Sequence, residues 1–243
     1  MARTFVIGDI HGAFRALTPL IGRLELRKDD TLVFLGDYVD GWSESAEVIE
    51  YLMELAKRYS CIFLKGNHDV WCEEWLDGLL PDVNWLMHGG LATVESYAQL
   101  TKTRRKQHLS FFRRMSLYHV DENNRLFVHA GFTSQQGPEG EHFLATLTWD
   151  RTLWELALAT DPALTADSNR YPKRLTRFSE VFIGHTPTTN FDQTLPMHAC
   201  NVWNLDTGAA FTGRLTAMNV DTYQFWQSEV VQGLYPEEKG RNP

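Results

Sequence analysis

The chain has 243 residues, 43% of them hydrophobic, and a formal net charge of −8 at pH 7. This length suits one domain with a substantial core, and the acidic balance argues against non-specific nucleic-acid binding, which depends on Lys and Arg neutralising phosphates. No apolar run approaches the roughly 18 residues of a membrane span, and we expect no signal peptide, because the first apolar run leads directly into a motif at Gly8. With three widely spaced cysteines outside any CxxC pattern, we expect a cytoplasmic protein with reduced thiols.

The first half of the chain alternates predicted strands and helices. Short β-rich runs at 5–7, 31–35 and 61–64 each precede a glycine-containing turn, which is typical of strands covered on both faces. A helix is predicted over 43–58, because Ser43 can cap its N-terminus and apolar residues recur there at helical spacing. These elements make a βαβαβ pattern.

The middle of the chain, about 70–116, is helical in pattern and rich in Trp and Arg, and it predicts a helical insertion over the strand ends. Strand runs return at 126–128 and 181–183, and the alternating runs between 200 and 231 predict antiparallel strands of a second sheet. We expect a single domain over 1–235, with 236–243 as a flexible C-terminal tail.

Five short motifs place a polar side chain just after an apolar run. They are Gly8-Asp9-Ile10-His11-Gly12, Gly36-Asp37-Tyr38-Val39-Asp40, Gly66-Asn67-His68-Asp69, His129-Ala130-Gly131 and Gly184-His185-Thr186. In an α/β sheet, ligands gather outside the carboxyl ends of the strands. We therefore predict a site for two divalent metal ions, whose ligands are Asp9, His11, Asp37, Asn67, His129 and His185.

Asp37 is the predicted bridging ligand, because a bridge needs an anion with two usable oxygens. Two divalent ions against two aspartates leave a surplus of positive charge that favours phosphate. The mixture of imidazole, carboxylate and amide groups fits manganese best, with iron or zinc as alternatives, and fits calcium poorly. His88 also precedes glycines, but it lies in a helical stretch, whereas His129 follows a strand run, so we favour His129.

His68 follows the predicted ligand Asn67 and is expected to face the substrate. Asp40 lies three residues after Asp37 and can pair with His68, and a carboxylate partner stabilises a protonated imidazole. His68 would then protonate the leaving oxygen as general acid while a metal-bridging hydroxide attacks in line. Arg151 and Asn67 are the candidate substrate-binding residues, Arg151 through its guanidinium.

In this order the five motifs resemble the calcineurin-like metallophosphoesterases. More narrowly, they are similar to the branch that holds serine/threonine protein phosphatases and bacterial symmetrical dinucleoside tetraphosphatases. The resemblance spans residues 8 to 186 and implies an α/β fold, a β-sandwich of two mixed sheets flanked by helices. It also implies the same six metal ligands, the acid pair of His68 and Asp40, and a phosphate-binding Arg151.

Two departures from the family pattern stand out. The family usually continues its second motif as GDxVDRG, whereas Gly41 occupies the place of that arginine here. Either phosphate binding is weaker, or a residue such as Arg170, Lys173 or Arg174 reaches in. The third motif usually reads GNHE; Asp69 shortens this acid by one methylene, and we expect its role to be structural.

The sequence predicts a metal-dependent phosphomonoesterase, acting first of all on phosphoserine or phosphothreonine in proteins. The alternative is a hydrolase of symmetrical dinucleoside tetraphosphates or another small phosphorylated metabolite, which would need a pocket for a base and a phosphate chain. A third alternative, an inactive binding module, predicts at least one eroded ligand, and all six are present.

Overall fold

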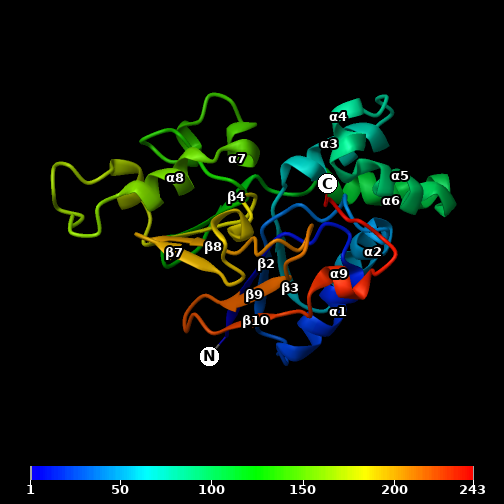
Figure 1. The fold of residues 1–243 in the computed structure, drawn as a ribbon, viewed down its shortest axis with the longest axis horizontal. Coiled ribbons are helices and arrows are strands. Elements are labelled where there is room, and N and C mark those ends of the chain that lie inside the picture. Colours follow the sequence, from blue (N-terminus) through cyan, green and yellow to red (C-terminus); the bar gives the residue numbers. More distant parts are fainter. Residues whose placement is uncertain (1, 243) are drawn as a thin grey trace.

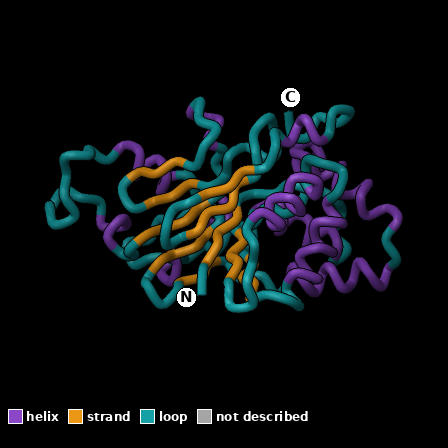
Figure 2. The backbone as a smooth tube through the Cα atoms, turned by 90° about the horizontal axis from the view of Figure 1, so that it is seen from below, coloured by secondary structure: helices purple, strands orange, loops and turns teal. Residues whose placement is uncertain are grey.

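Two five-stranded sheets pack face to face in the computed structural model, which describes residues 2–242 (Figures 1 and 2). The first sheet has the order β10-β9-β1-β2-β3, with β1 at Thr4–Ile7, β2 at Thr31–Phe34, β3 at Ser60–Phe63, β9 at Thr216–Asn219 and β10 at Phe225–Gln227. The second has the order β4-β5-β6-β8-β7, with β4 at Tyr118–Val120, β5 at Arg125–Val128, β6 at Glu180–Ile183, β7 at Met197–Ala199 and β8 at Val202–Asn204. Both sheets are mixed, which confirms the predicted sandwich.

One detail of the predicted topology is wrong. The alternating runs between 200 and 231 do not form a sheet of their own. Strands β9 and β10 instead extend the first sheet, where β9 pairs antiparallel with β1, while β7 and β8 join the second sheet. Alternation indicates a strand, but the pairing partner depends on contacts with distant parts of the chain.

The centre of the sandwich is filled by alternate side chains of the facing strands. Val6 and Val33 from the first sheet and Phe127 and Phe182 from the second belong to one buried cluster, in which the two phenylalanine rings stack with centroids 5.1 Å apart. The neighbouring residues on each strand point outward and are covered by helices. Burial on both faces explains why the strand runs read as continuously apolar.

Helices cover the outer faces of both sheets (Figure 2). On the first sheet lie α1 (Phe14–Arg23) and α2 (Ser45–Leu55), and on the second lies α8 (Thr152–Ala159). Helix α2 is the helix predicted over 43–58, but Ser43 is not its cap. The Ser43 hydroxyl instead donates to Glu238 over 2.7 Å, and α2 begins at Ser45. The remaining short elements are η3 (Pro138–Gly140), α7 (Thr146–Trp149), η4 (Lys173–Thr176), η5 (Thr188–Phe191) and α9 (Val231–Leu234).

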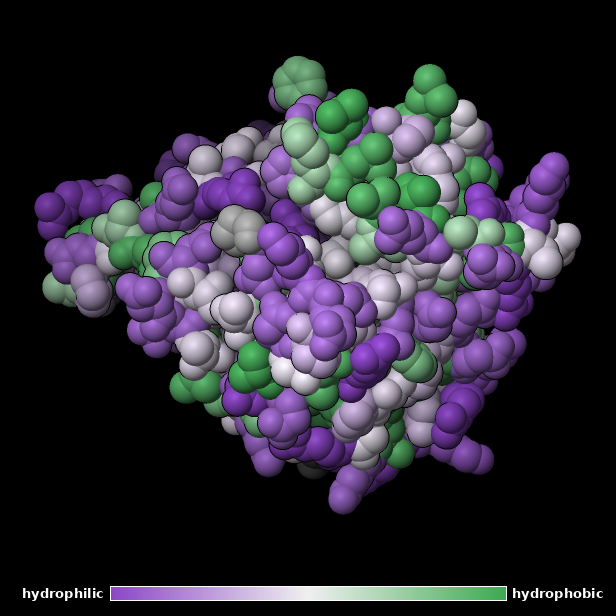
Figure 3. All heavy atoms as spheres, turned by 45° about the vertical axis from the view of Figure 1, so that its right-hand side comes forward, coloured by the Kyte–Doolittle hydropathy of each residue, from purple (hydrophilic) through white to green (hydrophobic). Residues whose placement is uncertain are grey.

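The predicted helical insertion lies between β3 and β4, at the upper right of Figure 1. It contains α3 (Asn67–Leu76), α4 (Val83–Trp85), η1 (Leu86–Gly90), α5 (Leu91–Ser96), η2 (Tyr97–Gln99) and α6 (Lys102–Phe112). Trp85 and Tyr97 are buried and anchor it. Figure 3 shows hydrophobic side chains gathered on its outer surface, where Leu80 and Met87 are exposed. Among residues 2–242, no helix is both long enough and apolar enough to span a bilayer.

Candidate metal centre

The six predicted metal ligands meet at one edge of the sandwich, and all are buried. Asp9 and His11 follow β1, Asp37 follows β2, Asn67 opens α3, and His129 and His185 follow β5 and β6. Three of them have left-handed backbones, with φ of 52° at His11, 52° at Asp37 and 66° at His185. Backbone strain of this kind in residues other than glycine often occurs at functional sites.

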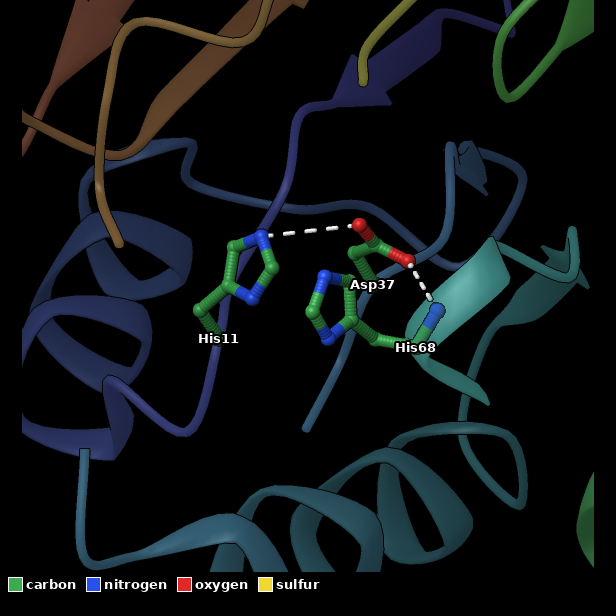
Figure 4. Close-up of side chains that lie close together, drawn as sticks. All are labelled: His11, Asp37 and His68. Atoms are coloured by element: carbon green, nitrogen blue, oxygen red, sulfur yellow. Dashed lines mark hydrogen bonds and ion pairs between the residues drawn. The ribbon is translucent and has the colours of Figure 1, made fainter. Parts of the chain in front are cut away.

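Asp37 lies between the two halves of this group. Its Oδ2 atom is 3.5 Å from Nε2 of His11 and 3.4 Å from Nε2 of His129. Its Oδ1 atom accepts a hydrogen bond from the backbone N–H of His68 over 3.0 Å, and Figure 4 shows both contacts of this carboxylate with His11 and His68. On the far side, Oδ1 of Asn67 is 3.2 Å from Nε2 of His129 and 3.0 Å from Nδ1 of His185.

The residues fit a pair of divalent ions. Two groups of potential ligand atoms each lie within 4.8 Å of one another and share Asp37: those of His11, Asp37 and His68, and those of Asp37, His129 and His185. His68 belongs to the first group by distance, but its Nδ1 atom pairs with Asp40. Within residues 2–242, Oδ1 of Asp9 and Nε2 of His185 are buried without a hydrogen-bond partner. Because buried polar atoms are rarely left unpaired, a bound cation explains both atoms, and the oxygen and imidazole set suits a transition metal.

Backbone carbonyls orient the histidine rings toward Asp37. Nδ1 of His129 donates to the carbonyl of Leu35 over 2.9 Å, and Nδ1 of His11 lies 3.1 Å from the carbonyl of Val39. Each ring therefore presents Nε2 to the centre, as hydrogen bonds behind metal-binding histidines commonly ensure. Burial lowers the pKa of His11 and of His185 well below the usual value, which favours the neutral imidazole that can bind metal.

Asp69 holds two of the motif loops together. Its carboxylate accepts hydrogen bonds from the backbone N–H groups of Asp37, Tyr38 and Gly66, over 2.7, 2.9 and 2.8 Å. Gly66 lies so close to Asp37 that a Cβ atom there would overlap the Asp37 carboxylate. The structural role expected for Asp69 is confirmed, because the shorter acid reaches all three donors.

His68 and Asp40 pair as predicted. Nδ1 of His68 lies 2.6 Å from Oδ2 of Asp40, and Asp40 is fully buried. The same carboxylate accepts from Nε1 of Trp85 over 2.6 Å and from the hydroxyl of Thr93 over 2.6 Å. Both donors come from the helical insertion, and sequence reasoning missed them because no local pattern links an indole or a hydroxyl to a carboxylate so far along the chain.

A cavity of about 530 Å³ opens beside this pair, lined by Asn67, His68, His185 and the predicted Arg151. His88 also lines it and donates from Nδ1 to the carbonyl of Asn84 over 2.6 Å. Trp71 and Trp149 meet edge to face on its wall, with ring centroids 5.1 Å apart.

Three basic residues are candidates from the sequence to replace the missing arginine at position 41: Arg170, Lys173 and Arg174. None of the three is among the described residues that line this cavity. Arg174 instead donates to the carbonyl of Phe132 over 2.8 Å. The arginine that lines the cavity beside Arg151 is Arg241, near the C-terminus. No sequence signal linked it to the site, because it lies two hundred positions from Gly41.

Asp206 is a further acid at the centre that sequence reasoning overlooked. It follows β8 and is buried, and burial raises its pKa to about 6. Burial also raises the pKa of Asp9 well above the usual value, and the negative charge of Asp206 adds to this shift. A weak signal was present, because Asp206 follows a short strand run, 202–205, although Asn204 interrupts its apolar residues.

Comparisons with known proteins agree with this geometry. The family model of calcineurin-like phosphoesterases matches residues 2–209. The chain is 27% identical over 226 residues, 87% of this chain and 88% of the relative, to bis(5'-nucleosyl)-tetraphosphatase PrpE (asymmetrical) of Geobacillus sp. strain WCH70. It is 28% identical over 228 residues, 88% of each protein, to the protein of the same name from Bacillus thuringiensis strain Al Hakam.

Two solved structures share the fold. A proposed diadenosine tetraphosphatase superposes with a TM-score of 0.65 at 19% identity, covering 93% of this chain and 92% of that one. A serine/threonine protein phosphatase from Saccharomyces cerevisiae superposes with a TM-score of 0.61 at 16% identity, covering 90% of this chain and 73% of that one.

Proposed function

Because the chain belongs to the calcineurin-like phosphoesterase family, we propose that it is a metal-dependent hydrolase of dinucleoside tetraphosphates. We propose that two divalent ions, with manganese as the first choice, are held by the six ligands Asp9, His11, Asp37, Asn67, His129 and His185. The names of the curated relatives support this substrate class. Protein phosphoesters, which the sequence analysis put first, become the second candidate.

The observation that carries the choice of substrate is the indole pair on the cavity wall. Trp149 is 42% exposed, and its ring centroid lies 6.0 Å from that of His185, while the ring of Trp71 lies 5.2 Å from that of His68. An exposed indole beside the ligands offers a stacking surface to a nucleobase, and such stacking contributes about 1–3 kcal/mol per base. A phosphoserine residue brings no aromatic group to use it.

The chain's own residues would divide the reaction between them. When bound, the ions would supply positive charge to the phosphoryl oxygens and acidify a water molecule. Arg151 would hold phosphoryl oxygens through its forked donors. Hydrolysis breaks one P–O bond of the phosphate chain; water gives its hydroxyl to one product, and His68, held in place by Asp40, would donate a proton to the departing oxygen of the other.

The test is a comparison of kcat/KM for diadenosine tetraphosphate and for a phosphothreonine peptide, after chelator treatment and reloading with manganese. We expect the dinucleotide to be preferred, and product analysis then tells which bond is cut, since ATP with AMP marks asymmetrical cleavage and two ADP symmetrical cleavage. A preference for the peptide would overturn the proposal.

A matched pair of variants tests the stacking surface. Trp149→Ala should raise KM for diadenosine tetraphosphate about 5- to 150-fold, the equivalent of one lost stacking contact. Its KM for inorganic tripolyphosphate should stay unchanged. Trp203→Ala is the control, because Trp203 lies on β8 and stacks on His198 outside the cavity. If the two variants raise KM equally, the nucleobase does not stack on Trp149 and this part of the proposal is wrong.

Phosphoserine and phosphothreonine in proteins remain the second candidate substrates because of the pairing between His68 and Asp40. An alkoxide is a much poorer leaving group than a nucleotide phosphate and depends more on a proton donor. The short contact between His68 and Asp40, 2.6 Å, suits such a substrate, and the same kinetic comparison would reveal it.

A further inference from the structure

The C-terminal segment crosses the candidate site next to Gly41. Gly41 has φ of +114°, and a Cβ atom there would lie 3.3 Å from Cγ and 3.7 Å from Cδ of Arg241. A Cβ atom on Gly89 would lie 3.1 Å from the same Cγ. The aliphatic part of Arg241 therefore runs through a notch between two glycines, and a side chain at position 41 would compete for its space.

Hydrogen bonds and close packing hold this segment beside the notch. The carboxylate of Glu238 accepts from the backbone N–H and the hydroxyl of Ser43, over 2.9 and 2.7 Å. The backbone N–H of Arg241 donates to the carbonyl of Ala210 over 2.9 Å. Gly240 lies against Trp42, so closely that a Cβ atom there would be 2.6 Å from the indole. The predicted flexible tail, 236–243, extends one residue beyond the described part of the chain; within it, Glu238, Gly240 and Arg241 contact the loop that follows β2 or Ala210.

The Arg241 side chain reaches the candidate cavity. The side chain is half-buried and lines the same cavity as His68 and Arg151. Its guanidinium carbon lies 5.3 Å from the ring centroid of Phe211, and its guanidinium forms no hydrogen bond or ion pair with the rest of residues 2–242. Five N–H donors on a stem packed against glycine and an aromatic ring are thus available to the cavity.

Arg241 and Arg151 approach the cavity from different parts of the fold. Arg151 precedes α8 on the second sheet, whereas Arg241 follows α9, whose helix packs near α1 on the first sheet. In Figure 1 the red segment that follows α9 runs toward the helical insertion, and α8 lies at the left of the molecule. Two guanidinium groups on separate walls suit a substrate with more than one phosphoryl group.

We propose that Arg241 binds a phosphoryl group of the substrate and that Gly41 supplies the space, rather than the charge, for this contact. This proposal rests on the proposed phosphoesterase function. A guanidinium can bind two oxygens of one phosphoryl group through parallel hydrogen bonds. The C-terminal segment is then part of the substrate site, although it follows the last recognisable motif by more than fifty residues.

The first experiment measures the binding of inorganic phosphate to the manganese-loaded protein by isothermal titration calorimetry. Arg241→Gln should weaken phosphate binding about 10- to 100-fold, as expected for losing hydrogen bonds from a charged donor, and Arg241→Lys should recover part of it. Lys239→Gln is the matched control, because it removes the same charge from an exposed side chain of the same segment. Metal content should be equal in all variants.

Kinetics give a second readout. Arg241→Gln should raise KM for diadenosine tetraphosphate, whereas a variant that had merely loosened the segment would lose bound metal and melt at a lower temperature. If Arg241→Gln and Lys239→Gln bind phosphate equally well, the proposal is refuted. If the wild-type protein binds phosphate through Arg241 yet hydrolyses neither the dinucleotide nor the peptide, the proposed function fails and the phosphate contact stands.

A measurement on the wild-type protein avoids any question of folding. Phenylglyoxal modifies accessible arginines, and mass spectrometry reports the rate at each one. Inorganic phosphate should slow the modification of Arg241 and leave that of Arg27 unchanged, because Arg27 is exposed in the loop before β2, at the opposite end of the strand from the ligands. Equal rates at Arg241 with and without phosphate would overturn the proposal.

Discussion

Replacing His68 with Asn tests the proposal that His68 is the proton donor of the site. The structure indicates that the fold should tolerate this change, because the buried Asp40 carboxylate keeps its hydrogen bonds from Trp85 and Thr93, each 2.6 Å long. The backbone N–H of residue 68 also remains available to Asp37. The variant should therefore lose an acid without losing the metal centre.

The size of the effect should depend on the leaving group. General acid catalysis contributes about 10²- to 10⁴-fold, equivalent to about 3–5 kcal/mol of transition-state stabilisation. An alkyl phosphate, whose leaving oxygen is strongly basic, should lose this full factor in kcat. An aryl phosphate such as p-nitrophenyl phosphate leaves as a stable anion and should lose about tenfold or less.

The assay is steady-state hydrolysis of a phosphothreonine peptide and of p-nitrophenyl phosphate by the manganese-loaded protein. His142→Asn serves as control, because His142 is an exposed histidine outside the cavity. Metal content should match that of the wild type. Equal losses on the two substrates would refute the general-acid role of His68, and loss of bound metal would show that the side chain belongs to the metal centre.

Three further changes have definite expected outcomes. Asp37→Asn should abolish activity and reduce the metal content measured by mass spectrometry to one ion or fewer per chain; two tightly held ions would contradict a bridging carboxylate. Trp85→Phe removes a donor from Asp40 and should lower kcat about tenfold with little change in KM; an unchanged kcat would mean that the indole only packs. Asp30→Asn tests stability: burial raises the pKa of Asp30, but hydrogen bonds from Arg3 and from the backbone N–H of Arg27 together hold it below its usual value, so the stabilisation is present above about pH 4 and is lost as pH falls through the lower folded-state pKa. The free energy of unfolding should drop by about 1–3 kcal/mol at pH 7, and the drop should shrink as the pH is lowered below about 4, as measured by urea denaturation.

The candidate ligands could be found from the sequence because each belongs to a local pattern. A buried strand reads as an apolar run, and the residue after it must emerge at the strand's carboxyl end. Asp9 and Asp37 follow the parallel neighbours β1 and β2, so these two converge because the strands are parallel. His129 follows β5 in the second sheet, and it reaches them only because the two sheets pack face to face. Asp206 obeys it as well, after β8, and was missed only because no motif marked it.

Contacts between residues that are far apart in the sequence could not be predicted from such local patterns. Asp40 receives hydrogen bonds from Trp85 and Thr93, 45 and 53 residues along the chain, and neither donor stands in a recognisable pattern. The pairing of β9 with β1 is of the same kind. Such partners depend on how the folded chain packs and on which buried polar groups still need a hydrogen bond.

The sequence by itself determined the reaction class, since strand periodicity and five local motifs are enough to place oxygen and imidazole ligands together. Only the tertiary structure decided what surrounds them: the indole pair of Trp71 and Trp149, and Arg241 in the notch beside Gly41. The physical reason is that metal ligands need local backbone geometry at strand ends, whereas the substrate wall is built by packing segments that are remote in the chain.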